Sequence, residues 1–259
     1  MNFANIGYSM SAMRREIRRK VGQVGIRGAF MSALRKIFRL RKNNSASAQA
    51  IHPFDLKYGT DTSGIIESGA LDIPEEAALH AVRYQTAIVE VFNKILSTLP
   101  LEDHNYVFVD LGSGKGRSLL LASQYPFKEI IGVELSPALH MTACENIRIY
   151  KDPAQRCHLI RSICDDATDF ALPDEYLVFY LFNPFDDKVM RRVVSNIEQS
   201  FRCKPRMMYI AYLKPVCRKL WDQATFLRVF KETESFVIYE TMMPALIVTD
   251  GKVSPALDS

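Results

Sequence analysis

The sequence predicts an α/β protein in which a mostly parallel β-sheet is covered by helices on both faces. From residue 106 onward, apolar segments of strand length alternate with segments of helical periodicity. The apolar segments are nearly continuous, as expected for parallel strands that are buried on both faces. A glycine-rich turn follows the first of them, which is where sheets of this kind bind ligands.

The elements expected from these patterns follow in chain order. Strands are predicted at 106–111, 129–134, 157–163, 176–182 and 206–213, and helices at 117–125, 136–150, 187–201 and 217–230. In the helix at 136–150, Ser136 suits the N-cap and Pro137 the first helical position. Apolar segments at 235–240 and 245–250 are predicted to pair as a closing antiparallel hairpin.

Ahead of the sheet, the pattern divides the chain into two parts. Residues 74–99 show helical periodicity, and residues 54–73, rich in Gly, Ser, Thr and Asp, are expected to form an ordered loop. Residues 43–50, "NNSASAQA", are small and polar and predict a linker. We therefore expect a leader with its linker at 1–50 and one globular domain at 51–259.

Charge is distributed unevenly between these parts. Residues 1–50 carry 11 of the 33 Lys and Arg but only one acid, so this segment is at +10 in a chain of net charge +4. Residues 30–38 place apolar side chains on one side of a basic helix. Such a helix could lie on an anionic membrane or bind an acidic partner through residues 1–42, and the alternative is a helix docked on its own domain.

Composition excludes several classes of function. A chain of 259 residues with 48% hydrophobic and 24% charged residues is typical of a globular protein, and no apolar stretch reaches the length of a membrane span. The five cysteines include no C-x-x-C pair, and the five histidines lack the spacing of a metal site, so we expect neither disulfides nor a metal. A cytoplasmic protein is the simplest interpretation, with peripheral contact to the inner face of a membrane as the alternative.

The turn "DLGSGKGR" at 110–117 admits three kinds of ligand. The dinucleotide pattern G-x-G-x-x-G requires a third glycine at 117, which is Arg117. The phosphate-binding pattern G-x-x-x-x-G-K-[ST] also fails, because Gly116 follows Lys115 and no glycine stands five residues before Gly114. The remaining pattern is D-x-G-x-G-x-G.

That pattern resembles the first motif of the class I S-adenosylmethionine-dependent methyltransferases. The resemblance implies that Asp110 faces the ammonium end of the cofactor and that the turn Gly112, Ser113, Gly114 and Gly116 lines the site. It further implies that Glu134, at the end of "IIGVE", binds the ribose hydroxyls, and that Asp166 of "CDDATDF" meets the adenine amino group.

"FDLKYGTDTSG", "RYQTA", "GVELSPALH" and "YLFNPF" narrow the resemblance to a bacterial group of these methyltransferases over about residues 52–250. "DLGSGKGR" and "GVELSP" are also similar to Rossmann-like protein-lysine methyltransferases, which makes Tyr84 of "RYQTA" a candidate for closing the cofactor site. The fold implied is a Rossmann-like, seven-stranded, mostly parallel sheet with a C-terminal antiparallel hairpin, preceded by N-terminal helices.

The acceptor chemistry is expected at "FNPF". The resemblance implies that Asn183 and Pro184 accept hydrogen bonds from a target amino group while Phe185 stacks on the substrate, although the second proline of the family's N-P-P-[YF] segment is missing. A protein lysine or a small molecule is the expected acceptor. Nucleic acid is disfavoured, because the domain is net acidic and no basic stripe interleaved with aromatics lies outside the leader.

A base is not assigned: Asp61, Asp186 and Asp187 are candidates, but each also suits a turn or a helix cap. Two other functions stay open. One is a protein that binds the cofactor without catalysis and acts through its basic leader. The other is a nicotinamide-dependent oxidoreductase, which Arg117 contradicts.

Overall fold

The computed structural model describes residues 52–64, 73, 87–102, 106–243, 246–249 and 252–255, the last two segments by their backbone alone. The predicted leader and linker at 1–50 lie outside the described residues. So do residues 74–86, the first half of the helix expected at 74–99.

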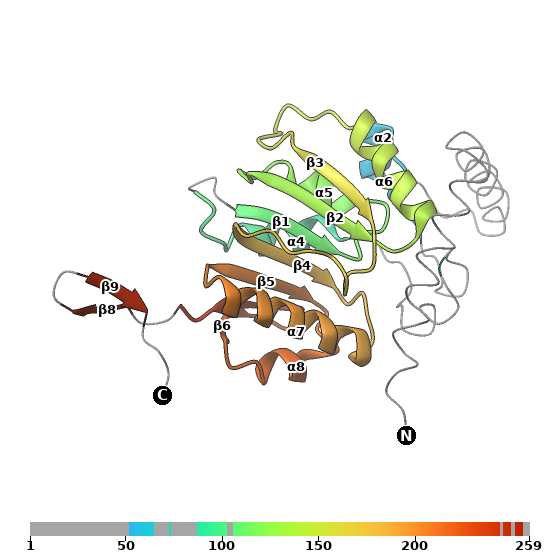
Figure 1. Cartoon of the computed structure of the whole chain (residues 1–259). Helices are drawn as coiled ribbons and strands as arrows, with labels where there is room; N and C mark the ends of the chain where they lie inside the picture. The colour runs from blue at the N-terminus through green and yellow to red at the C-terminus, as the bar shows by residue number, and fades with distance from the viewer. Residues whose placement is uncertain are drawn as a thin grey trace, which may run out of the picture. The chain divides into compact units, whose positions relative to one another are not determined.

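A seven-stranded sheet forms the centre of the domain (Figure 1). Its strands lie in the spatial order β3-β2-β1-β4-β5-β7-β6, and β1 to β5 are parallel whereas β7 is antiparallel to both of its neighbours. This arrangement confirms the predicted fold, the Rossmann-like sheet of class I methyltransferases. The strands are β1 (Tyr106–Leu111), β2 (Glu129–Glu134), β3 (Ile160–Cys164), β4 (Tyr176–Phe182), β5 (Met208–Leu213), β6 (Leu227–Glu232) and β7 (Phe236–Thr241).

The order of the strands fixes where a ligand can enter. After β1 the chain builds β2 and β3 on one side, and then crosses to build β4 and β5 on the other. Ligands of open α/β sheets bind at the carboxyl ends of the strands at such a reversal. Asp110 lies at this point, opposite Gly132 on β2 and Tyr180 on β4.

Helices cover both faces of the sheet, because successive side chains of a strand point to opposite faces and both sets are apolar. On β1, Phe108 faces a cluster that includes residues of α4 (Val89–Leu96) and α5 (Arg117–Ala122). Val107 and Val109 face a second cluster with residues of α7 (Asp187–Cys203) and α8 (Arg218–Asp222). The other helices are α2 (Pro53–Tyr58) and α6 (Pro137–Ile149).

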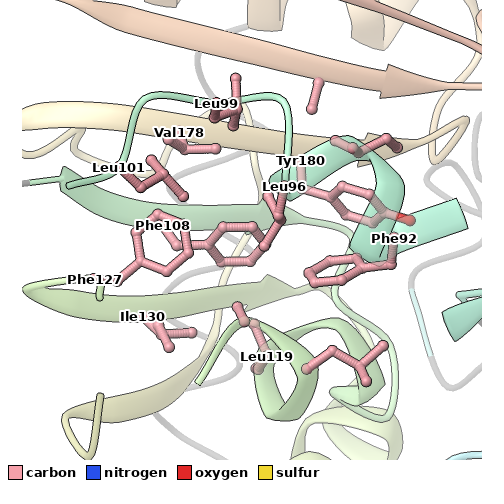
Figure 2. Packing of buried hydrophobic residues seen from close by; sticks show 14 of the residues in the cluster. Phe92, Leu96, Leu99, Leu101, Phe108, Leu119, Phe127, Ile130, Val178 and Tyr180 are labelled. Carbon is pink, nitrogen blue, oxygen red and sulfur yellow. The ribbon is translucent and has the colours of Figure 1, made fainter. Parts of the chain in front are cut away.

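Aromatic rings fill the first cluster (Figure 2). The ring of Phe92 on α4 lies 5.1 Å from that of Tyr180 and 6.0 Å from that of Phe108, between centroids. All three side chains are buried. Burial of one such ring contributes about 1.5–3 kcal/mol, so this contact anchors α4 to the centre of the sheet.

The predicted helix at 217–230 is wrong in its second half. Only α8 is helical there, and Leu227–Glu232 form strand β6, an edge strand whose last five residues are exposed. β6 pairs with β7, so the closing hairpin is made by these two strands and not by 235–240 with 245–250. The second predicted segment instead contributes β8 (Leu246–Thr249), which pairs with β9 (Lys252–Pro255) in a separate two-stranded sheet.

Two expectations ahead of the sheet also need correction. Residues Pro53–Tyr58 form helix α2 and not a loop, because the His52 ring caps the first turn and Gly59 ends it at φ 69°. The helix predicted at 74–99 is not continuous within its described part. Ile88 is extended at ψ 119°, so α4 begins only at Val89.

Arg206, just before β5, ties the end of α7 to the loop that leads into β4. Its buried guanidinium donates to the carbonyl oxygens of Pro173, Glu175, Ser200 and Lys204 at 2.7–3.0 Å and to Ser200 Oγ at 2.8 Å. The Lys204 carbonyl lies at the C-cap of α7, where helices leave acceptors unpaired, whereas the Ser200 carbonyl also accepts from the Lys204 amide at 3.1 Å. One buried side chain therefore donates to five acceptors at once.

We predict that Arg206→Met lowers the free energy of unfolding by about 2–4 kcal/mol, because five hydrogen bonds of a buried guanidinium are lost. The matched control is Arg202→Met. Arg202 is exposed near the end of the same helix and pairs with Glu198, so its loss is expected to cost less than about 0.5 kcal/mol. Urea unfolding of both variants tests this, and equal losses would contradict the role of Arg206.

Candidate active site

The glycine turn after β1 bends back onto β2. The amides of Gly112 and Ser113 both donate to the carbonyl oxygen of Val133, at 2.9 and 3.1 Å. Gly112, Gly114 and Gly116 all have positive φ, at 87°, 55° and 83°. Residues with a side chain rarely adopt these φ angles, so the backbone conformation of the turn favours glycine at all three positions.

Gly112 also permits a close approach between the ends of β1 and β4. A Cβ atom at this position would lie 2.7 Å from Cβ of Pro184, closer than real Cβ atoms come to another atom. Any side chain at 112 would therefore displace the segment Asn183–Phe185. The structure brings the predicted cofactor turn and the predicted acceptor segment into direct contact.

The Ser113 side chain points inward. A Cβ at Gly132 on β2 would lie 2.6 Å from Ser113 Oγ, so the absence of a side chain at 132 makes room for it. Ser113 Oγ is buried and has no hydrogen-bond partner among the described residues. Ser113 Oγ therefore lies against the backbone of β2 at Gly132, and the role of Ser113 in cofactor binding stays a prediction.

Asp110, near the end of β1, is a buried acid with one strong donor. Its side chain accepts a hydrogen bond from the Ser118 hydroxyl on α5. Burial raises the pKa of Asp110 to about 7; the Ser118 hydrogen bond opposes this shift and the charge of Glu134 adds to it. A buried carboxylate with so few donors is suited to a cationic ligand group.

Glu134, at the end of β2, links the glycine turn to the start of α6. Its two carboxylate oxygens accept hydrogen bonds from the amides of Gly114 and Ser136, both at 2.8 Å. Burial raises the pKa of Glu134, and these two amides oppose the shift. Each oxygen keeps a second lone pair, so the carboxylate can also accept hydrogen bonds from ligand hydroxyls.

The acids after β3 lie next to Glu134. The Asp165 amide donates to the carbonyl oxygen of Glu134 at 3.2 Å, which brings this loop to the same edge of the sheet. Asp166 is half-buried, and its Oδ1 accepts from the amide and the hydroxyl of Thr168, both at 2.8 Å. Oδ1 is thus used in a local turn, while Oδ2 remains for the predicted contact with adenine.

Asn183, after β4, has φ 43° and is one of two non-glycine residues with positive φ in the described chain. Asn tolerates this region better than most residues, and such strain is common at functional sites. The Tyr212 hydroxyl on β5 donates to Asn183 Oδ1 at 3.2 Å and accepts from the Cys217 amide at 3.2 Å. One hydrogen bond therefore holds the Asn183 side chain, and its donor, the Tyr212 hydroxyl, is itself held by the Cys217 amide.

The Phe185 side chain is partly buried and packs against the apolar cluster that includes residues of α7. Its predicted role, stacking on a substrate, stays a prediction.

The three candidate bases have structural partners. Asp61 pairs with Lys115 at 2.8 Å, Asp186 accepts from the Val189 amide at the N-cap of α7, and Asp187 pairs with Arg191 at 2.8 Å.

A buried ion pair that was not expected from the sequence joins α2 to the glycine turn. Asp55 and Arg117 are 4% and 3% exposed, and their side chains meet at 3.2 Å between Oδ2 and Nη2. Thr62 donates to Asp55 Oδ1 at 2.6 Å and accepts from Arg117 Nε at 2.7 Å. Burial raises the pKa of Asp55, but hydrogen bonds from Ser63, Thr62 and Thr60 outweigh it and hold the pKa below its ordinary value.

Asn146 on α6 extends these contacts to the turn itself. Its Nδ2 donates to the carbonyl oxygens of Asp61 and Lys115, both at 2.9 Å, and its Oδ1 accepts from the Asp61 amide at 2.8 Å. We call Asp55, Asp61, Thr62, Ser63, Lys115, Arg117 and Asn146 the polar clamp. In the sequence, only one feature pointed to these contacts, namely the charged residue Arg117 at the start of an otherwise apolar helix.

Tyr84, the candidate for closing the cofactor site, lies outside the described residues, as does the basic leader. In the part of the chain that the structure describes, no three His, Cys, Asp or Glu side chains gather as a metal site would require. Among the helices described, none has the length and apolarity that crossing a bilayer demands.

No family model and no curated protein matches the chain. Solved structures resemble it at low identity. An RNA methyltransferase from Salinibacter ruber in complex with S-adenosylhomocysteine is 17% identical at a TM-score of 0.44, over 64% of this chain and 98% of that one. The N-methyltransferase NodS from Bradyrhizobium japonicum is 13% identical at a TM-score of 0.43, over 60% of this chain and 96% of that one. The PH0226 protein of Pyrococcus horikoshii is 14% identical at a TM-score of 0.45, over 60% of this chain and 89% of that one.

The raised pKa of Asp110 predicts a cost in stability. Because the folded pKa lies above that of the unfolded chain, the folded state holds the extra proton, and stability falls as pH rises from about 4 to about 7. We therefore expect Asp110→Asn to raise the free energy of unfolding by roughly 2–4 kcal/mol at pH 8 and hardly at all at pH 4. Urea unfolding at both pH values measures this.

The control for Asp110→Asn is Asp174→Asn, which changes a carboxylate whose side chain is 71% exposed. It should shift stability by less than about 0.5 kcal/mol at either pH. A stabilisation by Asp110→Asn that is the same at pH 4 and pH 8 would contradict the burial of a carboxylate with a raised pKa.

Proposed function

We propose that this chain is an S-adenosylmethionine-dependent methyltransferase that binds its cofactor at the carboxyl ends of β1, β2 and β3. The methyl group would be transferred at the end of β4. The observation that carries the proposal is the convergence of two buried acids, Asp110 and Glu134, on a turn whose Gly112 touches Pro184.

The residues present fit this cofactor at both of its polar ends. An ammonium group has only donors, and Asp110 is a buried acceptor with a single strong donor of its own. A ribose has two hydroxyls, and Glu134 keeps one lone pair on each oxygen beyond its two backbone contacts. Asp166 Oδ2, beside the end of β2, supports the expected contact with the adenine amino group.

The bound sulfonium supplies an electrophilic methyl group, so the chain has to orient its acceptor and exclude water. Orientation and a dry site account for large rate factors without a covalent step. The contact between Gly112 and Pro184 supports this, because it leaves little distance between the two halves of the site. The polar clamp also holds the turn, through buried contacts at Lys115 and Arg117.

We predict that Glu134→Gln weakens binding of S-adenosylmethionine and S-adenosylhomocysteine about 10- to 100-fold, because hydrogen bonds to a charged acceptor contribute about 1.5–3 kcal/mol. Calorimetric titration measures the effect. Glu129→Gln is the matched control, since Glu129 begins the same strand and pairs with Arg161 at its other end.

In the same titration NADH serves as the control ligand. Binding of NADH but of neither S-adenosyl compound would contradict the proposal and favour an oxidoreductase. Equal affinities of the Glu129 and Glu134 variants for S-adenosylhomocysteine would overturn the assignment of Glu134.

For the acceptor, we propose an amino group of a protein or a small molecule, with Asn183 as the residue that orients it. The support is the position of Asn183, which is beside the glycine turn through Pro184 and is held by the Tyr212 hydroxyl. Oδ1 keeps a second lone pair that an amine hydrogen can use. The amine has to be neutral when it attacks, and no base is assigned to that proton.

We expect Asn183→Ala to slow methyl transfer about 100-fold or more and to leave the affinity for S-adenosylhomocysteine unchanged, because only orientation of the acceptor is lost. The measurement is transfer from methyl-labelled cofactor to the proteins and small molecules of a cell extract. The control Asn196→Ala changes another half-buried Asn, on α7, which donates to the Thr168 carbonyl. Wild-type transfer rates in the Asn183 variant would contradict its role.

A further inference from the structure

The Tyr180 hydroxyl on β4 is a buried polar group without a hydrogen-bond partner. Among the side-chain nitrogen and oxygen atoms of the described residues, only Ser113 Oγ, Trp221 Nε1 and this hydroxyl are buried and unpaired. Tyr180 is 1% exposed. Because buried hydroxyls almost always find a partner, an unpaired one in a native protein calls for an explanation, such as a ligand that supplies the partner.

The backbone places Tyr180 beside Asp110. The two residues are register partners on the adjacent parallel strands β4 and β1, so their side chains leave the same face of the sheet next to each other. The Tyr180 ring packs between Phe92 and Phe108, with centroids 5.1 and 6.2 Å away. Figure 2 shows its hydroxyl pointing away from Phe108 and Phe127.

The charge of Asp110 suits a neutral neighbour. Burial raises the pKa of Tyr180 well above its ordinary value, and the Asp110 carboxylate raises it further. Tyr180 therefore stays protonated and adds no second negative charge beside Asp110. Its oxygen can still accept a hydrogen bond, so the two side chains present two acceptors and a single negative charge.

We propose that the Tyr180 hydroxyl binds the ammonium group at the amino acid end of the cofactor together with Asp110, an inference that rests on the proposed function. An ammonium group carries three N–H donors and no acceptor. One N–H would reach the Asp110 carboxylate and another the Tyr180 oxygen. The Tyr180 ring lies in an apolar cluster, and a hydrogen bond in such surroundings is electrostatically stronger than one in water.

The test compares two ligands in calorimetric titrations at pH 8. S-adenosylhomocysteine has the amino acid end, and methylthioadenosine lacks it but shares the adenosyl group. Tyr180→Phe should weaken S-adenosylhomocysteine about tenfold or more and leave the affinity for methylthioadenosine unchanged. In an Asp110→Asn background the same substitution should lose most of its effect, because the two residues act on one group.

Thermal unfolding of the ligand-free variants gives a second readout. Tyr180→Phe removes an unpaired hydroxyl, so its melting temperature should equal or exceed that of the wild type. The matched control is Tyr239→Phe, another fully buried tyrosine, whose hydroxyl donates to Asp222 at 2.7 Å. This control should melt at a lower temperature and bind both ligands like the wild type.

The outcomes separate this inference from the proposed function. If the wild type binds neither ligand, the proposed function fails and the inference fails with it. If the wild type binds both and Tyr180→Phe binds S-adenosylhomocysteine equally well, only the inference is overturned. Equal weakening of both ligands would also overturn it, because the hydroxyl would then not act on the amino acid end.

Discussion

The close approach of Gly112 to Pro184 is the constraint on which the candidate site depends. It exists because β1 and β4 are neighbours in the sheet and because residue 112 has no side chain. The glycine turn and the Asn183 segment come from parts of the chain about 70 residues apart in sequence, yet they touch at this point. A methyl donor bound at the first and an acceptor bound at the second would therefore occupy neighbouring parts of one site.

The two acids around this contact lower the stability of the ligand-free protein and are suited to binding a ligand. Asp110 and Glu134 are both buried, and burial raises the pKa of each, which means that their charged forms destabilise the ligand-free fold. A cationic group and a pair of hydroxyls would supply the missing partners. Such a balance is common at active sites, where residues that would be unfavourable elsewhere are kept for their function.

The polar clamp explains how the glycine turn keeps its shape next to buried charges. Asp55 and Arg117 satisfy each other inside the protein, and Thr62 bonds to both. Removing one member of such a buried pair would leave the other charge buried without compensation, at a cost of about 3–5 kcal/mol. The clamp thereby makes α2 a structural part of the site.

The sequence was sufficient for the centre of the sheet, because β1, β2, β4 and β5 are buried on both faces and are therefore continuously apolar. It failed at β6, an edge strand whose Val229 and Phe230 are exposed and whose pattern also fits a helix. The structure brings Asp110, Glu134 and the glycine turn together at one edge of the sheet, and their roles in binding a cofactor stay predictions. The polar clamp and Tyr180 could not be predicted, because each depends on contacts between segments distant in sequence, such as Asp55 with Arg117.

The most direct measurement of the central claim is amide hydrogen exchange of the full chain with and without S-adenosylhomocysteine. Binding at the carboxyl ends of β1 and β2 predicts slower exchange in the turn at 112–116 and in the segment at 134–136, with no change in the β6–β7 hairpin. No slowing in either segment at saturating ligand, or slowing confined to the hairpin, would contradict the proposed site.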